Sequence, residues 1–244
     1  MTGFFVLSCS SCLCLLIFFV FLCGKMKKIA FYGGSFDPFH NGHLTIAKKL
    51  TEIFQLNEFV FVPAFHAPHK KDKKPTSAFH RFAMLCLATN DEAKIKVSKM
   101  EIDAPEKPYT FETLTKLKNE LIDAEIFFVL GADSWEEITT WREWETVLTL
   151  TNVIVVTRPG YEIGFSHVTE EIRKRIVDLR GSSQQENKGQ RTKDKGQKIF
   201  VTDAVQLNIS STAIRQKIRE NTSDWCEFVP EEVAKYIEKY ELYI

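Results

Sequence analysis

Residues 33–43 read Gly-Gly-Ser-Phe-Asp-Pro-Phe-His-Asn-Gly-His and lie between the apolar run Ile29–Tyr32 and a helix-like stretch that begins at Leu44. Paired glycines and two histidines thus stand where a strand passes into a helix. Glycine lets the backbone approach a ligand closely, and the first turn of a helix presents unpaired N–H groups that attract anions. His40 and His43 share one face of that turn because they are three residues apart. The segment therefore predicts a phosphate-binding site.

The spacing within this segment excludes two common phosphate loops. The chain contains no G-x-x-x-x-G-K-[ST] run, and the paired glycines lack the third glycine of a dinucleotide-binding fingerprint. The remaining pattern, H-x-G-H after a glycine-rich strand end, resembles that of the nucleotidyltransferase superfamily, which includes the class I aminoacyl-tRNA synthetases.

A second segment with phosphate-binding character lies near the end of the chain, at residues 209–215. Its hydroxyl residues directly precede Ala213 and Ile214 and predict the N-cap of a helix. Arg215 falls in the first turn, where a cation is unfavourable unless an anion lies nearby. Hydroxyls, free N–H groups and a guanidinium together suit a polyphosphate.

Taken in order, these two segments and several others resemble bacterial nicotinate-nucleotide adenylyltransferases, enzymes that join ATP to nicotinate mononucleotide. The resemblance runs from about Met26 to the end of the chain. Besides the two segments it includes Pro63–Lys70, His80–Leu85, Pro108–Thr110, Gly131–Ser134, Trp141, Arg158–Tyr161 and Val229–Ile237.

For ATP, the resemblance implies contacts from both segments. It places His40 and His43 at the transferring phosphates and Asp133 at the adenosine ribose. The other implied ATP-binding residues are Gly33, Gly34, Ser35, Phe36, Gly131, Ile209, Ser210, Ser211 and Thr212, with Arg215 on the outer phosphates.

For the mononucleotide, the resemblance implies an aromatic pocket. Trp141 is the expected stacking partner of the nicotinate ring, because indole offers a large flat face to an electron-poor aromatic. Tyr109 and Thr110 match positions whose backbone amides hold the nicotinate carboxylate. The other tryptophans are interpreted as core residues: Trp135, Trp144 and Trp225.

Adenylyl transfer requires no covalent nucleophile, because a phosphate oxygen of the mononucleotide attacks the α-phosphorus of ATP and pyrophosphate leaves. The protein must align two anions and neutralise the charge that builds on the phosphoryl oxygens. We expect His40, His43, Lys70 and Arg215 to be the catalytic donors. Mg²⁺ is expected to bridge phosphate oxygens, and no side-chain metal site is expected.

Apolar runs alternate with helical patterns from Met26 onward, which predicts an α/β fold: one domain with a doubly wound, mainly parallel, Rossmann-like sheet. Because ligands bind beyond the carboxyl ends of such strands, Gly33, Pro63, Gly131, Arg158 and the Ser210 region should gather at one edge. The expected strands are 28–32, 58–62, 95–98, 126–130, 153–157 and 199–202. The expected helices are 43–54, 77–89, 110–121, 144–150, 168–180, 212–220 and 231–240.

Two parts of the chain fall outside this pattern. Residues 1–25 form an apolar extension, of which Phe4–Cys23 is long enough to cross a bilayer. We interpret Met26 as the true start and residues 26–244 as the nucleotidyltransferase domain; a membrane partner follows only if residues 4–23 are retained. Residues 181–198 are polar and almost devoid of apolar side chains, which predicts a mobile loop.

Composition narrows the partners. The 32 basic and 32 acidic side chains balance, so no nucleic-acid partner is expected. Only Cys86 and Cys226 lie beyond residue 25, which favours a reducing compartment and a cytoplasmic location. A homo-oligomer stays open.

Three alternatives to this function stay open. An adenylyltransferase for nicotinamide mononucleotide or phosphopantetheine would share the H-x-G-H segment, although phosphopantetheine enzymes lack the Trp141 and Pro108–Thr110 regions. A class I synthetase would need a longer chain and a lysine loop, which Ser98-Lys99-Met100 does not provide. A non-catalytic nucleotide sensor would bind ATP without turnover.

Overall fold

The computed structural model describes residues 26–65, 76–104, 106, 108–157, 163–181, 196–205 and 207–244. Several predictions lie outside these residues and are not tested by the fold. They concern the apolar extension 1–25, the catalytic Lys70, the segment around Arg158 and residues 182–195 of the polar loop.

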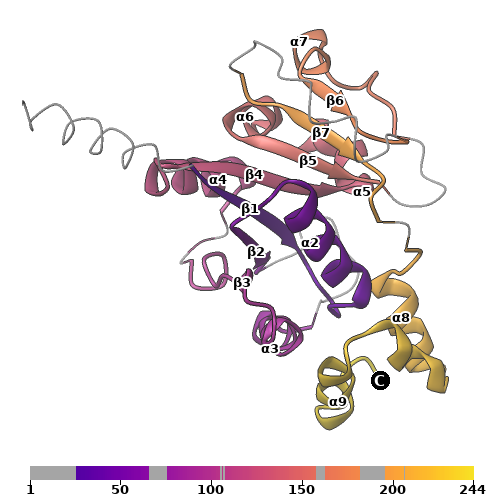
Figure 1. The fold of residues 1–244 in the computed structure, drawn as a ribbon. Coiled ribbons are helices and arrows are strands. Elements are labelled where there is room, and N and C mark those ends of the chain that lie inside the picture. Colours follow the sequence, from indigo (N-terminus) through magenta and orange to yellow (C-terminus); the bar gives the residue numbers. More distant parts are fainter. Residues whose placement is uncertain are drawn as a thin grey trace, which may run out of the picture.

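Within the described residues, seven parallel strands form one sheet in the order β3-β2-β1-β4-β5-β7-β6 (Figure 1). The strands are β1 (Lys27–Gly34), β2 (Glu58–Pro63), β3 (Ile95–Val97), β4 (Ala124–Gly131), β5 (Asn152–Val156), β6 (Ile176–Asp178) and β7 (Ile199–Thr202). The helices are α2 (Asn41–Ile53), α3 (Ala78–Thr89), α4 (Thr110–Glu120), α5 (Ala132–Glu136), α6 (Trp144–Leu150), α7 (Glu170–Arg173), α8 (Ser211–Arg219) and α9 (Glu231–Lys239). Two 3₁₀ turns, η1 (Ile138–Thr140) and η3 (Ser223–Phe228), complete the described elements.

The central strand β1 shows why the sheet is doubly wound. Ile29 and Phe31 pack into a core with α4, α6 and α7, whereas Ala30 and Tyr32 pack into a second core with α2 and α3. Successive side chains of a strand point to opposite faces, so helices on both faces require an unbroken apolar run rather than alternation. The predicted single-domain, doubly wound α/β fold is therefore confirmed.

The C-terminal helices form a third cluster beside α3. Met84 of α3 packs with Ile214 of α8 and with Val233 and Ile237 of α9. Figure 1 shows α8 and α9, in yellow, beyond the end of the sheet at which α2 begins. This packing brings the last part of the chain next to the segment at residues 33–43.

The predicted helix over residues 168–180 is wrong beyond its first part. α7 covers only Glu170–Arg173, and Ile176–Asp178 form strand β6, which pairs with β7. Without β6, the outer edge of β7 would present unpaired backbone groups. Ile176 and Val177 are β-branched and suit a strand, so pairing overrides the helical pattern. The short elements α5, η1 and η3 were not among the expected helices.

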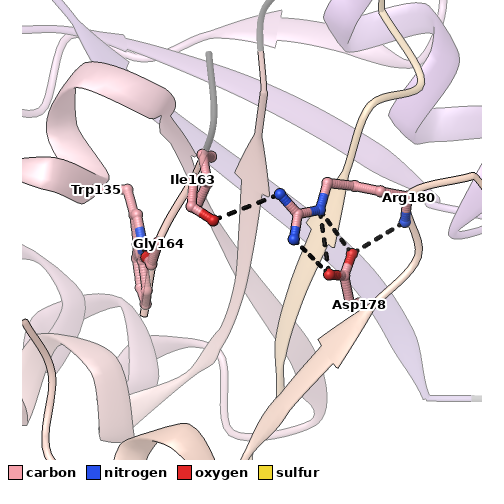
Figure 2. Close-up of polar contacts among 5 residues, drawn as sticks. All are labelled: Trp135, Ile163, Gly164, Asp178 and Arg180. Carbon is pink, nitrogen blue, oxygen red and sulfur yellow. Dashed lines mark hydrogen bonds and ion pairs between the residues drawn. The ribbon is translucent and has the colours of Figure 1, made fainter. Parts of the chain in front are cut away.

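Trp135 joins the chain that follows β5 to the core through a hydrogen bond. Its side chain is fully buried, and its indole N–H donates to the carbonyl oxygen of Gly164 at 3.0 Å. The adjacent carbonyl of Ile163 accepts a bond from Arg180, which also pairs with Asp178 at the end of β6 (Figure 2). The hydrogen bonds from Arg180 lower the pKa of the Asp178 carboxyl group. The interpretation of Trp135 as a core residue is therefore confirmed.

Among the described residues, no helix combines the length and apolar character that crossing a membrane requires.

We expect Trp135→Ala to lower the free energy of unfolding by about 3–5 kcal/mol, because it removes a fully buried ring and its hydrogen bond. Urea denaturation measures the effect. Trp225→Ala is the control, since Trp225 is only partly buried beside the C-terminal helices. A Trp135 variant no less stable than the Trp225 variant would contradict this role.

Candidate active site

The carboxyl ends of three neighbouring strands meet at one edge of the sheet. Gly34 lies opposite Pro63 of β2, and β4 ends at Gly131 opposite Val156. The predicted gathering of Gly33, Pro63 and Gly131 is thus present in the structure.

The turn between β1 and α2 packs tightly against the core. Phe36 and Phe39 are buried and contact Phe61 of β2 edge to face. A side chain at Gly34 would bring its Cβ within 2.9 Å of the Phe36 ring, so the second glycine is required by a close approach. The ring of Phe36 is part of the core, so the predicted ATP contact of this residue would come from its backbone.

The two histidines lie at the start of α2. His40 is the N-cap residue, and its backbone N–H donates to Nδ1 of His43 at 3.3 Å. The rings stack with centroids 3.7 Å apart, and their residues are only 3% and 8% exposed. Because Nδ1 of His43 accepts this bond, the proton of its neutral ring is on Nε2.

The glycine of the H-x-G-H pattern also has a steric reason. A Cβ at Gly42 would lie 3.0 Å from Nδ1 of His40 and 3.7 Å from Cβ of Ile209. Residue 42 therefore separates the stacked histidines from the second predicted phosphate segment. A Cβ at this position would crowd the His40 ring, whereas its contact with Ile209 would be of ordinary length.

The start of α8 lies directly against the turn before α2. Ser210 caps α8 by accepting a bond from the N–H of Ala213 at 3.2 Å. Ser211 Oγ donates to the carbonyl of Pro38 at 3.0 Å, across 173 residues of sequence. Arg215 donates to the carbonyl of Asp37 and, at 3.3 Å, to the hydroxyl of Thr212. The two predicted phosphate segments are therefore adjacent in space.

Asp37 connects this turn to the C-terminus of the chain. Its carboxylate is buried and accepts bonds from the hydroxyl of Tyr243 at 2.8 Å and from the N–H of Thr76 at 3.4 Å. Burial raises the pKa of Tyr243 well above its usual value, and the negative charge of Asp37 raises it further. The hydroxyl therefore stays protonated and donates. Sequence reasoning missed this pair, since no local pattern links residues 206 positions apart.

Arg81 also positions the turn between β1 and α2, and the sequence indicated no definite role for it. It is 1% exposed, and its guanidinium donates to the carbonyls of Ser35 and Ala64, each at 2.6 Å, and of Thr76 at 2.9 Å. Burial lowers the pKa of Arg81, and the charge of Asp37 acts in the opposite direction. Arg81 thereby joins the ends of β1 and β2. The available signal was an arginine on the apolar face that Met84 and Leu85 define.

A cavity of about 400 Å³ opens beside this edge on the α4 side of the sheet. It extends from the end of β1 to the first turn of α4 and brings three predicted residues, Tyr109, Thr110 and Trp141, to the predicted Gly33, Gly34 and Ser35. The remaining described lining residues are Phe31, Val62, Ala64, Phe65, Glu101, Pro108, Thr113, Leu114, Leu117, Phe128, Ser134, Thr140 and Arg142. The indole nitrogen of Trp141 is buried without a hydrogen-bond partner among the described residues.

Two of the predicted positions differ from the expected geometry. The backbone N–H of Tyr109 donates to the Glu112 carboxylate at 2.8 Å, so this amide is already engaged. Thr110 is the first residue of α4, and its N–H has no partner within the helix. Asp133 is exposed in the first turn of α5 and does not line the cavity, although its neighbour Ser134 does.

Comparison with known proteins agrees with this arrangement. The cytidylyltransferase-like family model matches residues 31–217. A protein from Clostridium acetobutylicum named probable nicotinate-nucleotide adenylyltransferase is 36% identical over 90% of this chain and 100% of its own length. A protein of the same name from Corynebacterium jeikeium is 33% identical over 87% of this chain and 98% of its own. The chain belongs to the nicotinate-nucleotide adenylyltransferase family.

The fold of the family matches as well. Plasmodium falciparum nicotinic acid mononucleotide adenylyltransferase complexed with NaAD aligns with a TM-score of 0.66 over 89% of this chain and 97% of that chain, at 24% identity. The resemblance read from the residue blocks, the fold and the nucleotidyltransferase class are thus confirmed. The individual site residues stay predictions.

We expect Tyr243→Phe to lower the free energy of unfolding by about 1–3 kcal/mol, because a buried carboxylate oxygen of Asp37 loses its donor. Thermal or urea unfolding measures the change. Tyr240→Phe is the matched control, since Tyr240 is 48% exposed. Equal losses for the two variants would contradict the role of the Tyr243 hydroxyl.

Proposed function

We propose that this chain transfers the adenylyl group of ATP to nicotinate mononucleotide, giving nicotinate adenine dinucleotide and pyrophosphate in NAD biosynthesis. The observation that carries the proposal is the contact between the starts of α2 and α8 beside the cavity that contains Trp141. Two helix starts favour a polyphosphate, and the neighbouring cavity suits a planar aromatic group. Such a site can hold the two substrates end to end.

In this mechanism the protein aligns and neutralises rather than forming a covalent bond. A phosphate oxygen of the mononucleotide attacks the α-phosphorus, and the bond to pyrophosphate breaks. The proposed donor to a phosphoryl oxygen is the Nε2–H of His43, since Nδ1 accepts the bond from His40 and the proton is then on Nε2. His40 acts beside it, and Arg215, Lys70 and the hydroxyls of Ser210 and Thr212 hold the outer phosphates. The hydroxyl of Ser211 already donates to the carbonyl of Pro38.

Two positioning residues keep the phosphate turn in place during the reaction. Arg81 fixes the backbone of Ser35, and Asp37 holds the turn through Tyr243 and Thr76. Preorganised donors stabilise developing charge because they need no rearrangement in the transition state. The turn is therefore built to present its N–H groups to ATP.

The described groups at the two helix starts suit a metal ion that enters the site bound to the substrate phosphates. The candidate donors at the two helix starts are N–H groups, hydroxyls, two imidazoles and the guanidinium of Arg215, and the carboxylate of Asp37 accepts two hydrogen bonds within the protein. Within the described ranges, no group of three His, Cys, Asp or Glu residues could hold a metal ion. Mg²⁺ usually keeps several waters and binds through substrate phosphates, where it would neutralise their charge. We propose Mg²⁺ bound in this way.

We further propose that residues 26–244 are the catalytic unit and that it works in the cytoplasm. The seven described strands and the helices that cover them all lie within these residues.

The test is pyrophosphate release by the purified protein with ATP, Mg²⁺ and one of three acceptors: nicotinate mononucleotide, nicotinamide mononucleotide or phosphopantetheine. We expect release with nicotinate mononucleotide, with the dinucleotide as the second product. Preferred release with phosphopantetheine, or ATP binding without turnover, would refute the proposal.

We expect His43→Ala to lower kcat by roughly 10²-fold or more, the scale of losing a transition-state donor. Steady-state pyrophosphate assays measure the loss. The matched control is His80→Asn, since His80 lies on α3 and contacts Tyr236 of α9. An unchanged kcat in a folded His43 variant would remove this residue from the mechanism.

We expect Trp141→Ala to raise the KM for the mononucleotide and to leave the KM for ATP nearly unchanged, because the indole stacks on the pyridine ring alone. A series with Trp141→Phe should show an intermediate KM, since phenylalanine keeps part of the flat surface. Equal effects on the two KM values would contradict the stacking role.

A further inference from the structure

One wall of the cavity carries a positive charge beside the Trp141 ring. Arg142 follows Trp141 directly, and its guanidinium carbon lies 4.6 Å from the ring centroid of Tyr109 and 5.9 Å from that of Phe111. Both Arg142 and Tyr109 line the cavity. The guanidinium is therefore held over the first turn of α4, at the end of the cavity assigned to the pyridine ring.

Few charged side chains line the cavity, and their charges have opposite signs. Among its described lining residues, Arg142 is the only cation and Glu101 the only carboxylate. Glu101 accepts a bond from the hydroxyl of Thr113 at 3.5 Å, within α4. None of the ion pairs between described residues includes Arg142. A ligand carboxylate would thus be repelled by Glu101 and attracted by Arg142.

At the start of α4, the backbone N–H groups alone do not suffice to bind a ligand carboxylate. The N–H of Tyr109, implied by resemblance to hold the nicotinate carboxylate, already donates to Glu112. This contact also adds a negative charge at the helix start. A ligand carboxylate needs further donors here, and a guanidinium offers two parallel N–H groups that match its two oxygens.

We propose that Arg142 is a specificity-determining residue whose guanidinium receives the carboxylate of the pyridine ring and thereby selects the acid over the amide. The inference rests on the proposed function. A nicotinamide group carries no charge and offers one acceptor oxygen in place of two, so it gains neither the attraction between charges nor a bidentate pair. Stacking on Tyr109 orients the guanidinium beforehand, which reduces the ordering cost of binding.

The test compares wild type, Arg142→Gln and Arg142→Lys with nicotinate and nicotinamide mononucleotides. For Arg142→Gln we expect the ratio of the two kcat/KM values to fall roughly 10- to 100-fold in favour of the amide, the range for a charged hydrogen-bond pair. The KM for nicotinate mononucleotide should carry the change, while the KM for ATP stays constant. Arg142→Lys should restore part of the preference. Arg173→Gln on the exposed surface of α7 controls for loss of one positive charge.

An unchanged acid-to-amide ratio in the Gln variant, or the same shift in the Arg173 control, would overturn the inference. Failure of the proposed function looks different, since wild type itself would then release no pyrophosphate with nicotinate mononucleotide. In that case titration calorimetry with nicotinate mononucleotide still decides: equal binding by wild type and Arg142→Gln, or binding by neither, contradicts the role. Thermal unfolding checks each variant, and Arg142→Lys serves if the Gln variant does not fold.

Discussion

Two backbone carbonyl groups, those of Asp37 and Pro38, accept hydrogen bonds from the first turn of α8, and the relative position of the two predicted phosphate segments depends on this contact. The carbonyls belong to the turn that ends at the stacked histidines, and the donors come from a helix near the C-terminus. A cation such as Arg215 is unfavourable at a helix start, and the partial negative charge of the Asp37 carbonyl oxygen offsets part of this cost. The contact therefore sets the distance between the two helix starts that are proposed to share one triphosphate.

The rest of the site supports this turn from other directions. Arg81 holds it from the side of β2, and Tyr243 holds the Asp37 carboxylate from the end of the chain. Each support uses a buried polar group that makes two or more hydrogen bonds, so the arrangement is costly to disrupt. The aromatic cavity lies on the other side of the same strand ends, formed largely by residues of α4 and the chain around Trp141. Different groups of residues thus hold the proposed phosphate-binding and ring-binding parts of the site, and the two parts meet at Gly33–Ser35.

The sequence predicted those features that short-range chemistry determines. Ser210 caps a helix because a hydroxyl before an apolar pattern satisfies a free N–H, and the doubly wound sheet follows from apolar runs that alternate with amphipathic helices. The parallel strand ends then bring Gly33 and Gly131 to one edge wherever the chain is described. The order of the residue blocks was enough to identify the family.

The sequence could not predict what distant contacts determine. Strand β6 exists because an open edge of β7 lies beside it, and the pairing of Asp37 with Tyr243 spans nearly the whole domain. The amide of Tyr109 was expected to be free for a ligand, yet a carboxylate three residues later along its own helix occupies it. In each case the competing partner, not the local pattern, decides which groups remain for function.

Hydrogen–deuterium exchange of the full protein with and without ATP and Mg²⁺ tests most directly whether one triphosphate is held by both helix starts. If one triphosphate contacts both helix starts, exchange becomes slower at residues 33–44 and at residues 209–216 together, with the same dependence on ATP concentration. Protection of only one of these segments, or protection of the two at different ATP concentrations, would contradict it.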